Sequence, residues 1–240
     1  MDNSKPTGKL YLIPSLMGDV EPLEVLPLAV KKVIDMTFHY IVENEKSARA
    51  FIKKVHPGKS QDKLNMYVLN KYTEPEEIPT FLEACMHGYH MGIISEAGAP
   101  GIADPGSDVI TMAYEKDIRV VPLVGPSSIL MAMMASGMNG QNFAFTGYLP
   151  IDKGERSKQI RVLEKWSRES GQTQIFMETP YRNDKLFQDL MDTCNDHTRL
   201  CVACDITLPS EMIKTQTISW WKKNTPDLEK RPTIFILSAS

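Results

Sequence analysis

The chain has few of the features that mark membrane, secreted or fibrous proteins. None of its 240 residues lies in an uninterrupted apolar run of about 18 positions, the length that a membrane-spanning helix needs. The start, MDNSKPTGK, lacks the charged and then apolar pattern of a signal peptide. Hydrophobic residues make up 42% and charged residues 24%, close to the averages for globular domains. We therefore expect a folded cytoplasmic protein without a membrane partner.

The chain also has little excess charge and few cysteines. Its net charge of −3 and pI near 6.0 exclude a general affinity for nucleic-acid backbones, so any RNA contact needs a local basic patch. The CxxC pair in CVACDIT has no second pair to complete a structural zinc site. Without a secretion signal, a disulfide framework is not expected either. We expect no metal, and reduced, buried thiols at Cys85, Cys194, Cys201 and Cys204.

Three common catalytic motifs are missing. The segment HPGKSQ lacks the glycine that a phosphate loop requires five positions before Gly58, where Lys53 stands. No G-x-G-x-x-G follows the first predicted strand, which argues against a nicotinamide cofactor. No G-x-S-x-G is present, so the nucleophile of an α/β-hydrolase is not indicated.

The chain contains two different secondary-structure patterns. From Lys9 to about Gly137, short apolar runs alternate with amphipathic stretches, which is typical of βα units in a doubly wound, mostly parallel sheet. Beyond Gly140 the last predicted strands follow one another without crossover helices, which indicates a mixed sheet. We therefore predict an α/β protein with an N-terminal domain over residues 1–138 and a C-terminal α/β domain over residues 141–240. The stretch MASGMNGQNF is the predicted linker.

Ligands of open parallel sheets bind at the carboxyl ends of the strands, where this chain has three unusual loops. They are SLMGD, ISEAGAPGIADPG and VGPSS. Their glycines allow a ligand to approach the backbone, and their prolines stiffen the loops and remove amide donors. With Asp19, Glu96 and Asp104 they form an acceptor-rich rim that suits ribose hydroxyls, an amino group or a sulfonium.

Purely structural roles are also open for these loops. Ser127 can cap the following helix, and Gly98 and Gly101 can serve the turn alone. Asp104 can act as a loop anchor that accepts hydrogen bonds from loop amides.

The three loops together resemble a known family. ISEAGAPGIADPGSDVI, RVVPLVGPSS and FAFTGYLP follow in the order seen in the tetrapyrrole methylase superfamily of S-adenosyl-L-methionine-dependent methyltransferases. IFMETPYR and ACDIT add two further elements. The chain is most similar to the branch of ribosomal RNA small subunit (cytidine-2′-O)-methyltransferases. The resemblance implies two α/β domains, a cleft between them that holds the methyl donor, and a homodimer.

The resemblance also implies site residues. Methyl transfer from S-adenosyl-L-methionine needs a nucleophile aligned behind the methyl group and a group that accepts its proton. Glu96 and Glu178 are the candidate proton acceptors, Arg182 a candidate for orienting the substrate, and Asp104 a participant or a loop anchor. The implied cofactor contacts are Leu16, Ala97, Gly98, Ala99, Ile102, Ser127, Ser128, Glu178 and Ile206.

Three hypotheses on function follow from these residues. The first is methylation of RNA, at a ribose 2′-hydroxyl of small-subunit ribosomal RNA, which makes the ribosomal subunit a partner. The second is methylation of a tetrapyrrole or another small molecule. The third is a non-catalytic homologue that keeps only the nucleoside pocket.

The chain departs from the branch where the substrate is expected. Residues 43–46 read Glu-Asn-Glu-Lys in place of E-D-T-R, and Cys204, Asp205 and Leu208 replace parts of A-R-E-x-T-K. The segment EKRP stands in place of K-G-E. One basic helix is predicted to be either a phosphate-facing surface or an ordinary solvated face; its residues are Lys153, Arg156, Lys158, Arg161, Lys165 and Arg168.

Overall fold

The computed structural model describes residues 7–74 and 76–239. The chain divides into two compact units, Met1–Ser127 and Ser128–Ser240. Each unit has its own sheet and its own hydrophobic core. The two-domain α/β prediction is therefore confirmed at the level of the fold.

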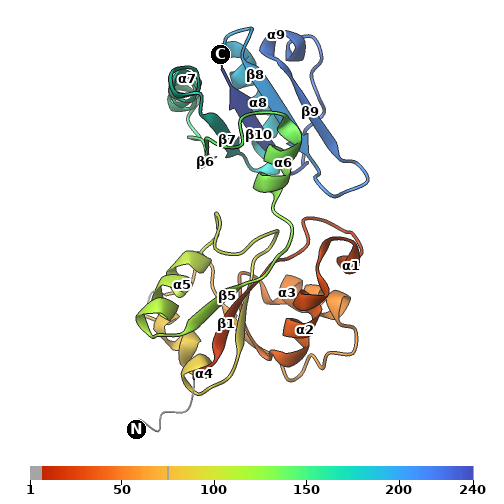
Figure 1. The fold of residues 1–240 in the computed structure, drawn as a ribbon, viewed down its shortest axis with the longest axis vertical. Helices are drawn as coiled ribbons and strands as arrows, with labels where there is room; N and C mark the ends of the chain where they lie inside the picture. The colour runs from red at the N-terminus through yellow and green to blue at the C-terminus, as the bar shows by residue number, and fades with distance from the viewer. Residues whose placement is uncertain (1–6, 75, 240) are drawn as a thin grey trace. The chain divides into compact units, whose positions relative to one another are not determined.

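The first unit is built on five parallel strands in the order β3-β2-β4-β1-β5 (Figure 1). Their bounds are β1 (Lys9–Ile13), β2 (His39–Val42), β3 (Asn65–Val68), β4 (Met91–Ile94) and β5 (Arg119–Pro122). Strands β4 and β1 are neighbours in the sheet, although β2 and β3 lie between them in the sequence. The loops that follow these strands therefore meet at one edge of the sheet, where ligands of this class of sheet bind.

Helices cover both faces of this sheet, as Figure 1 shows. One face carries α1 (Pro22–Val25), α2 (Leu28–Met36) and α3 (Glu45–Val55), and the other η1 (Ile78–Leu82), α4 (Glu83–Met86) and α5 (Gly106–Glu115). Alternate residues of each strand point to opposite layers. Ile13 and Ile94 pack in the first layer, and Leu10 and Ile93 in the second.

Helix α3 is well defined by its sequence. The Asn44 side chain caps its first turn, where Oδ1 accepts from the backbone amides of Lys46 and Ser47 at 2.9 and 3.1 Å. Ala48, Ile52 and Val55 recur at helical spacing and are buried against the sheet. The neighbouring face of the helix is thereby turned toward the carboxyl edge of the strands.

The second unit holds a mixed five-stranded sheet in the order β6-β7-β10-β8-β9, as predicted. The strands are β6 (Phe143–Tyr148), β7 (Thr173–Met177), β8 (Arg199–Cys204), β9 (Met212–Thr217) and β10 (Thr233–Ser238). The helices are α6 (Ser128–Ser136), α7 (Lys153–Ser170), η2 (Pro180–Arg182), α8 (Asn183–Thr193) and α9 (Ile218–Trp221). Their shared core contains Phe176, Phe187, Trp221 and Phe235.

The division between the units differs from the predicted linker near Gly137. Helix α6 packs on β9 and β10, and the Thr215 hydroxyl donates to the Ser136 carbonyl at 2.7 Å. The compact second unit therefore begins at Ser128. The glycine-rich stretch is a turn within this unit, in which Gly137 has φ +63°. The pattern of strands and helices did not reveal with which sheet α6 packs.

The predicted phosphate-facing surface of α7 is wrong for Arg156. This side chain is buried and forms an ion pair with Asp189, with Nε 2.7 Å from Oδ2. Lys158 and Lys165 pair with glutamates of the same helix, at 2.7 Å and 3.8 Å. The part of the helix that carries these two lysines is therefore a self-paired, solvated face, whereas Lys153 pairs with Asp189 and Asp192 of α8.

Two further expectations concern the cysteines and membrane helices. All four cysteines are buried free thiols, as predicted. Within the described residues, no helix combines the length and the apolar character needed to cross a bilayer.

Candidate functional site

The loops that follow β1 and β4 are joined at Gly98. The Ser15 amide donates to the Gly98 carbonyl at 2.9 Å, and the Ser95 hydroxyl donates to the same oxygen at 3.1 Å. Gly98 has φ +72°, in the left-handed region that side chains disfavour. Two donors thus occupy the Gly98 carbonyl, so this glycine holds the loops together.

The loop after β5 completes the same wall. A Cβ atom on Gly125 would lie 2.2 Å from Pro14 Cγ, so only glycine allows this approach of the third loop to the first. The Cβ position of Gly98 would lie 3.5 Å from the Pro126 carbonyl oxygen. The prediction that these loops meet at the carboxyl edge is confirmed within the first unit.

Asp104 ties the long loop to itself. Its Oδ1 accepts from the backbone amides of Gly101 at 2.9 Å and Gly106 at 2.8 Å. Burial raises the pKa of Asp104. Gly101 has φ +82°, and Ala103 has φ +59° between the two tied segments. These contacts favour the loop anchor among the two roles considered for Asp104.

A second acid, Glu43, supports the start of this loop. The Glu96 amide donates to Glu43 Oε1 at 3.3 Å, while the exposed Glu96 carboxylate accepts from the Ser47 hydroxyl at 2.6 Å. Burial raises the pKa of Glu43, and the nearby charges of Asp104 and Glu96 raise it further. The carboxyl edge of the first sheet is therefore rich in acceptors, as predicted.

We expect replacement of Glu43 with glutamine to stabilise the protein at pH 7 and to have less effect near pH 4. A carboxyl whose pKa is raised on folding contributes stability below its ordinary pKa of 4.5 and loses it as pH rises through the folded value. Glutamine keeps the acceptor for the Glu96 amide and removes the titration. Thermal unfolding of both proteins at several pH values measures this difference.

An exposed carboxyl provides the control for the Glu43 experiment. Glu24→Gln in α1 changes one exposed charge without altering a partly buried group, and it is expected to leave the melting temperature close to that of the wild-type protein. Equal shifts of the melting temperature by Glu43→Gln at pH 4 and pH 7 would contradict the raised pKa of this half-buried carboxyl.

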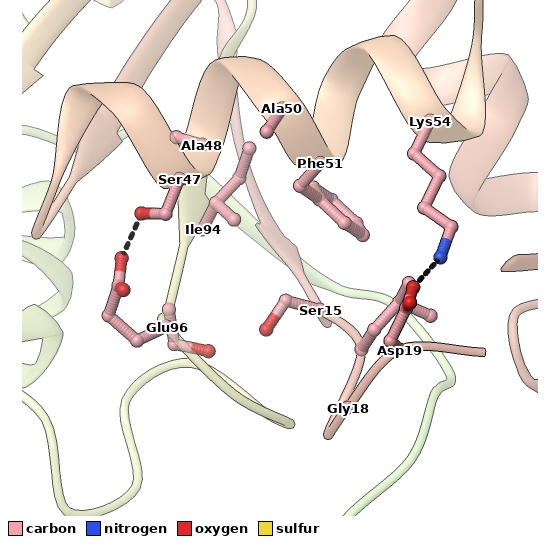
Figure 2. A pocket seen from close by; sticks show the side chains of 12 residues that line it. Ser15, Gly18, Asp19, Ser47, Ala48, Ala50, Phe51, Lys54, Ile94 and Glu96 are labelled. Carbon is pink, nitrogen blue, oxygen red and sulfur yellow. Dashed lines mark hydrogen bonds and ion pairs between the residues drawn. The ribbon is translucent and has the colours of Figure 1, made fainter.

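A trough of about 300 Å³ lies next to the joined loops (Figure 2). One wall is α3, and the opposite wall is the loop after β1 with the end of β4. Its polar and aromatic lining comes from Ser15, Asp19, Ser47, Phe51, Lys54, Ser95 and Glu96. Sequence reasoning missed the three residues of α3, although their spacing of four and three places them on one helical face.

Figure 2 shows a polar pair at each end of the trough. Ser47 and Glu96 form one pair, and Lys54 Nζ lies 2.5 Å from Asp19 Oδ1 in the other. The hydrogen bond from Lys54 lowers the pKa of Asp19 and keeps it charged. The Phe51 side chain lies between the two pairs.

In the second unit, Glu178 and Arg182 are brought together. Glu178 follows β7 and is buried, and its Oε1 accepts from the Thr179 amide at 2.7 Å and from Arg182 Nη2 at 2.6 Å. This carboxylate therefore has two strong donors on one oxygen. The pairing of Glu178 with Arg182, which lie four residues apart, fixes the turn at the start of α8.

Two sequence departures meet after β8. Asp205 is buried with φ +51°, and its Oδ2 accepts from Arg231 Nε at 2.7 Å and from the Ser210 hydroxyl at 2.8 Å. Arg231 belongs to the EKRP segment, and Cys204 occupies the position at which the family has arginine. Arg231, from another part of the unit, thus pairs with Asp205.

The remaining predicted residues are divided between the units. In the first, Leu16, Ala99 and Ser127 are half-buried, and Ala97 and Ile102 are exposed. In the second, Ser128 begins α6 and Ile206 is buried. Their shared role as cofactor contacts stays a prediction. Among the described residues, no group of three His, Cys, Asp or Glu side chains is placed to hold a metal ion.

Known proteins resemble this chain over most of its length. A protein of Vibrio cholerae named ribosomal RNA small subunit methyltransferase I is 27% identical over 88% of this chain and 70% of the relative. A protein of the same name from Streptococcus pyogenes is 29% identical over 75% of this chain and 58% of the relative. The match therefore spans somewhat more than half of the second relative.

Solved structures show the same fold at low sequence identity. Uroporphyrin-III C-methyl transferase from Thermus thermophilus, complexed with S-adenyl homocysteine, superposes with a TM-score of 0.56 and 15% identity. The likeness covers 96% of this chain and 97% of that structure. Residues 23–219 match the family described as tetrapyrrole (corrin/porphyrin) methylases. Since this match spans most of the chain, including the loops after β4 and β5, the chain belongs to the tetrapyrrole methylase family.

Proposed function

We propose that this protein transfers the methyl group of S-adenosylmethionine to RNA, with a ribose 2′-hydroxyl of small-subunit ribosomal RNA as acceptor. The main observation in support of this methyl donor is the wall of three loops joined through Gly98, in a chain of the methylase family. The acceptor is supported by the two relatives named as ribosomal RNA methyltransferases.

The composition of the loops supports a nucleoside donor. Their exposed backbone and carboxylates offer acceptors to ribose hydroxyls and to a sulfonium, and this suits S-adenosylmethionine. Because the Gly98 carbonyl is already occupied by two donors, Gly98 contributes through its missing side chain. The other proposed contacts of the first unit are Leu16, Ala97, Ala99, Ile102 and Ser127. Ser128, Glu178 and Ile206 are the proposed contacts of the second.

The reaction needs alignment and removal of one proton. The hydroxyl oxygen forms a bond to the methyl carbon as the carbon–sulfur bond breaks, and S-adenosylhomocysteine leaves as a neutral sulfide. Alignment of the two reactants can contribute about 7–11 kcal/mol. The proton passes to a carboxylate in the same step, since a free carboxylate is too weak a base to form an alkoxide first.

The two proposed proton acceptors differ in their surroundings. Glu178 already holds two donors on Oε1, whereas Glu96 is exposed at the trough and accepts from the Ser47 hydroxyl. This difference supports Glu96 as the proton acceptor, with Glu178 and Arg182 as a pair that positions a ligand. Asp104 then acts through the loop that carries Glu96.

Two rival functions use the same donor pocket. The family description names corrin and porphyrin methylases, so a tetrapyrrole or another small molecule is the second candidate acceptor. A non-catalytic homologue that binds only the nucleoside is the third candidate. A cytoplasmic location and a homodimer belong to the first proposal and stay predictions.

Parallel methyl transfer assays separate these functions. Labelled S-adenosylmethionine is offered with total RNA, with small ribosomal subunits and with a panel of tetrapyrroles. We expect label in RNA from the small subunit, and loss of that label in Glu178→Ala and Arg182→Ala. Arg168→Ala on the solvated face of α7 serves as the control and is expected to retain transfer. Label in a tetrapyrrole alone would contradict the proposed acceptor, and label in none would favour the non-catalytic homologue.

A further inference from the structure

We infer that the trough beside α3 holds one nucleotide of the RNA strand, with its base against Phe51 and its phosphate at Lys54. This inference rests on the proposed function, because it assigns part of the acceptor site. Four observations within the first unit carry it.

The first observation is the form of the trough. Phe51 and Lys54 point from one face of α3 toward the loop after β1, and Ser47 on the same face points toward Glu96, as Figure 2 shows. The volume of about 300 Å³ lies at the lower end of the range for small-molecule sites, which suits a single nucleotide. Glu96, whose carboxylate is the proposed proton acceptor, lies at one end of the trough. A nucleotide placed there lies beside the reacting hydroxyl.

The second observation is the aromatic side chain in the middle. Phe51 is half-buried and packs against the core of the α2 and α3 layer, which holds its ring in place. Its other side contributes to the lining of the trough. Aromatic platforms of this kind stack on nucleobases of any identity. Phe51 is therefore suited to bind a base without reading its sequence.

The third observation is the ion pair at the far end. The Lys54 side chain is 33% exposed, whereas that of its partner Asp19 is 98% exposed. An ion pair with so exposed a partner contributes little stability, because water solvates the carboxylate equally well. A phosphate of the strand can therefore replace Asp19 as the partner of Lys54. In the free protein Asp19 occupies the position of that phosphate.

The fourth observation is an unsatisfied hydroxyl. Ser15 lines the trough and is 3% exposed, and its Oγ has no hydrogen-bond partner among the described residues. A buried hydroxyl without a partner destabilises the folded state. A sugar or base atom of a bound nucleotide provides that partner.

Two charge variants at the far end give opposite expected results. Binding of a fluorescent single-stranded RNA of about ten nucleotides is followed by anisotropy at several salt concentrations. Lys54→Met is expected to raise Kd about 5-fold to 10-fold and to reduce the salt slope by about one. Asp19→Asn is expected to lower Kd about 2-fold to 3-fold, because it frees Lys54 and removes a negative charge. If the ion pair between Lys54 and Asp19 serves only the fold, both variants are expected to weaken RNA binding.

The aromatic side chain is tested by a variant that preserves the core. Phe51→Leu keeps an apolar side chain against the helix layer and removes the stacking surface. We expect it to raise Kd for the RNA about 10-fold, the loss that corresponds to one stacked base. The thermal shift caused by S-adenosylhomocysteine is expected to stay the same in all three variants. Its loss in Lys54→Met and Phe51→Leu would show that the cofactor occupies the trough and would overturn the inference.

The two proposals fail in different ways. If wild-type protein does not bind the RNA, or if Lys54→Met and Asp19→Asn shift Kd in the same direction, the trough is not a strand site. Methyl transfer to RNA with that result would leave the proposed function intact. Conversely, opposite shifts of Kd without methyl transfer to any RNA would overturn the proposed acceptor and retain the strand site.

Discussion

Replacement of Gly125 with alanine is expected to lower the rate of methyl transfer about 100-fold, because it displaces one wall of the proposed donor pocket. The new Cβ would lie 2.2 Å from Pro14 Cγ and 2.4 Å from Pro14 Cβ, far inside van der Waals contact. The loop after β5 must therefore move away from the loop after β1. Overpacking of this kind also lowers the free energy of unfolding by about 1–3 kcal/mol.

A second glycine in the same unit provides the control. At Gly58 a Cβ would be 3.6 Å from the side chain of His56, at Cε1, which is an ordinary contact. Gly58→Ala is therefore expected to keep both stability and methyl transfer. Calorimetric titration with S-adenosylhomocysteine, together with thermal unfolding, separates a lost pocket from a lost fold. Wild-type affinity in Gly125→Ala would show that the contact between the two loops is not needed for binding.

Removal of the Asp189 carboxylate is expected to cost about 3–5 kcal/mol of folding free energy, the largest stability effect predicted for this chain. The side chains of Arg156 and Asp189 are only 7% and 4% exposed. Arg156 also donates through Nη1 to the carbonyls of Pro150 at 3.0 Å and Ile151 at 2.7 Å. Asp189→Ala leaves this guanidinium buried without its counter-charge. Unfolding in denaturant measures the resulting loss of folding free energy.

A double variant tests the electrostatic cause. Arg156→Met with Asp189→Leu replaces both charges with apolar side chains, and this exchange is often neutral or stabilising in buried pairs. We expect it to recover most of the stability lost in Asp189→Ala. If the double variant is as unstable as the single one, the loss comes from packing or from the two carbonyl contacts.

Much of the first unit could be predicted from the sequence because its signals are local. Continuous apolar strands and amphipathic helices alternate, and this pattern requires a parallel sheet covered on both faces. Strand β4 ends directly before ISEAGAPGIADPG, so the position of that loop at the carboxyl edge follows from the pattern alone. Gly98 joins the loops after β1 and β4, and this is consistent with the high glycine content of the loop after β4.

The rest depends on contacts between residues far apart in the chain. Ser47 and Glu96 are 49 positions apart, and Lys54 and Asp19 are 35 apart, so no local pattern indicates either pair. Arg156 lies on the face of α7 that Ile160 and Leu163 bury, but its partner Asp189 is 33 positions away in α8. The partner of Asp205 likewise comes from Arg231, 26 positions away.

The central claim is that this chain methylates a ribose hydroxyl of ribosomal RNA. The most direct test is to incubate small ribosomal subunits with labelled S-adenosylmethionine and the protein, digest the RNA to nucleosides and identify the labelled one. We predict that the label is recovered in a 2′-O-methylated nucleoside. Recovery of the label only in a base-methylated nucleoside, or no label in the RNA, would contradict the claim.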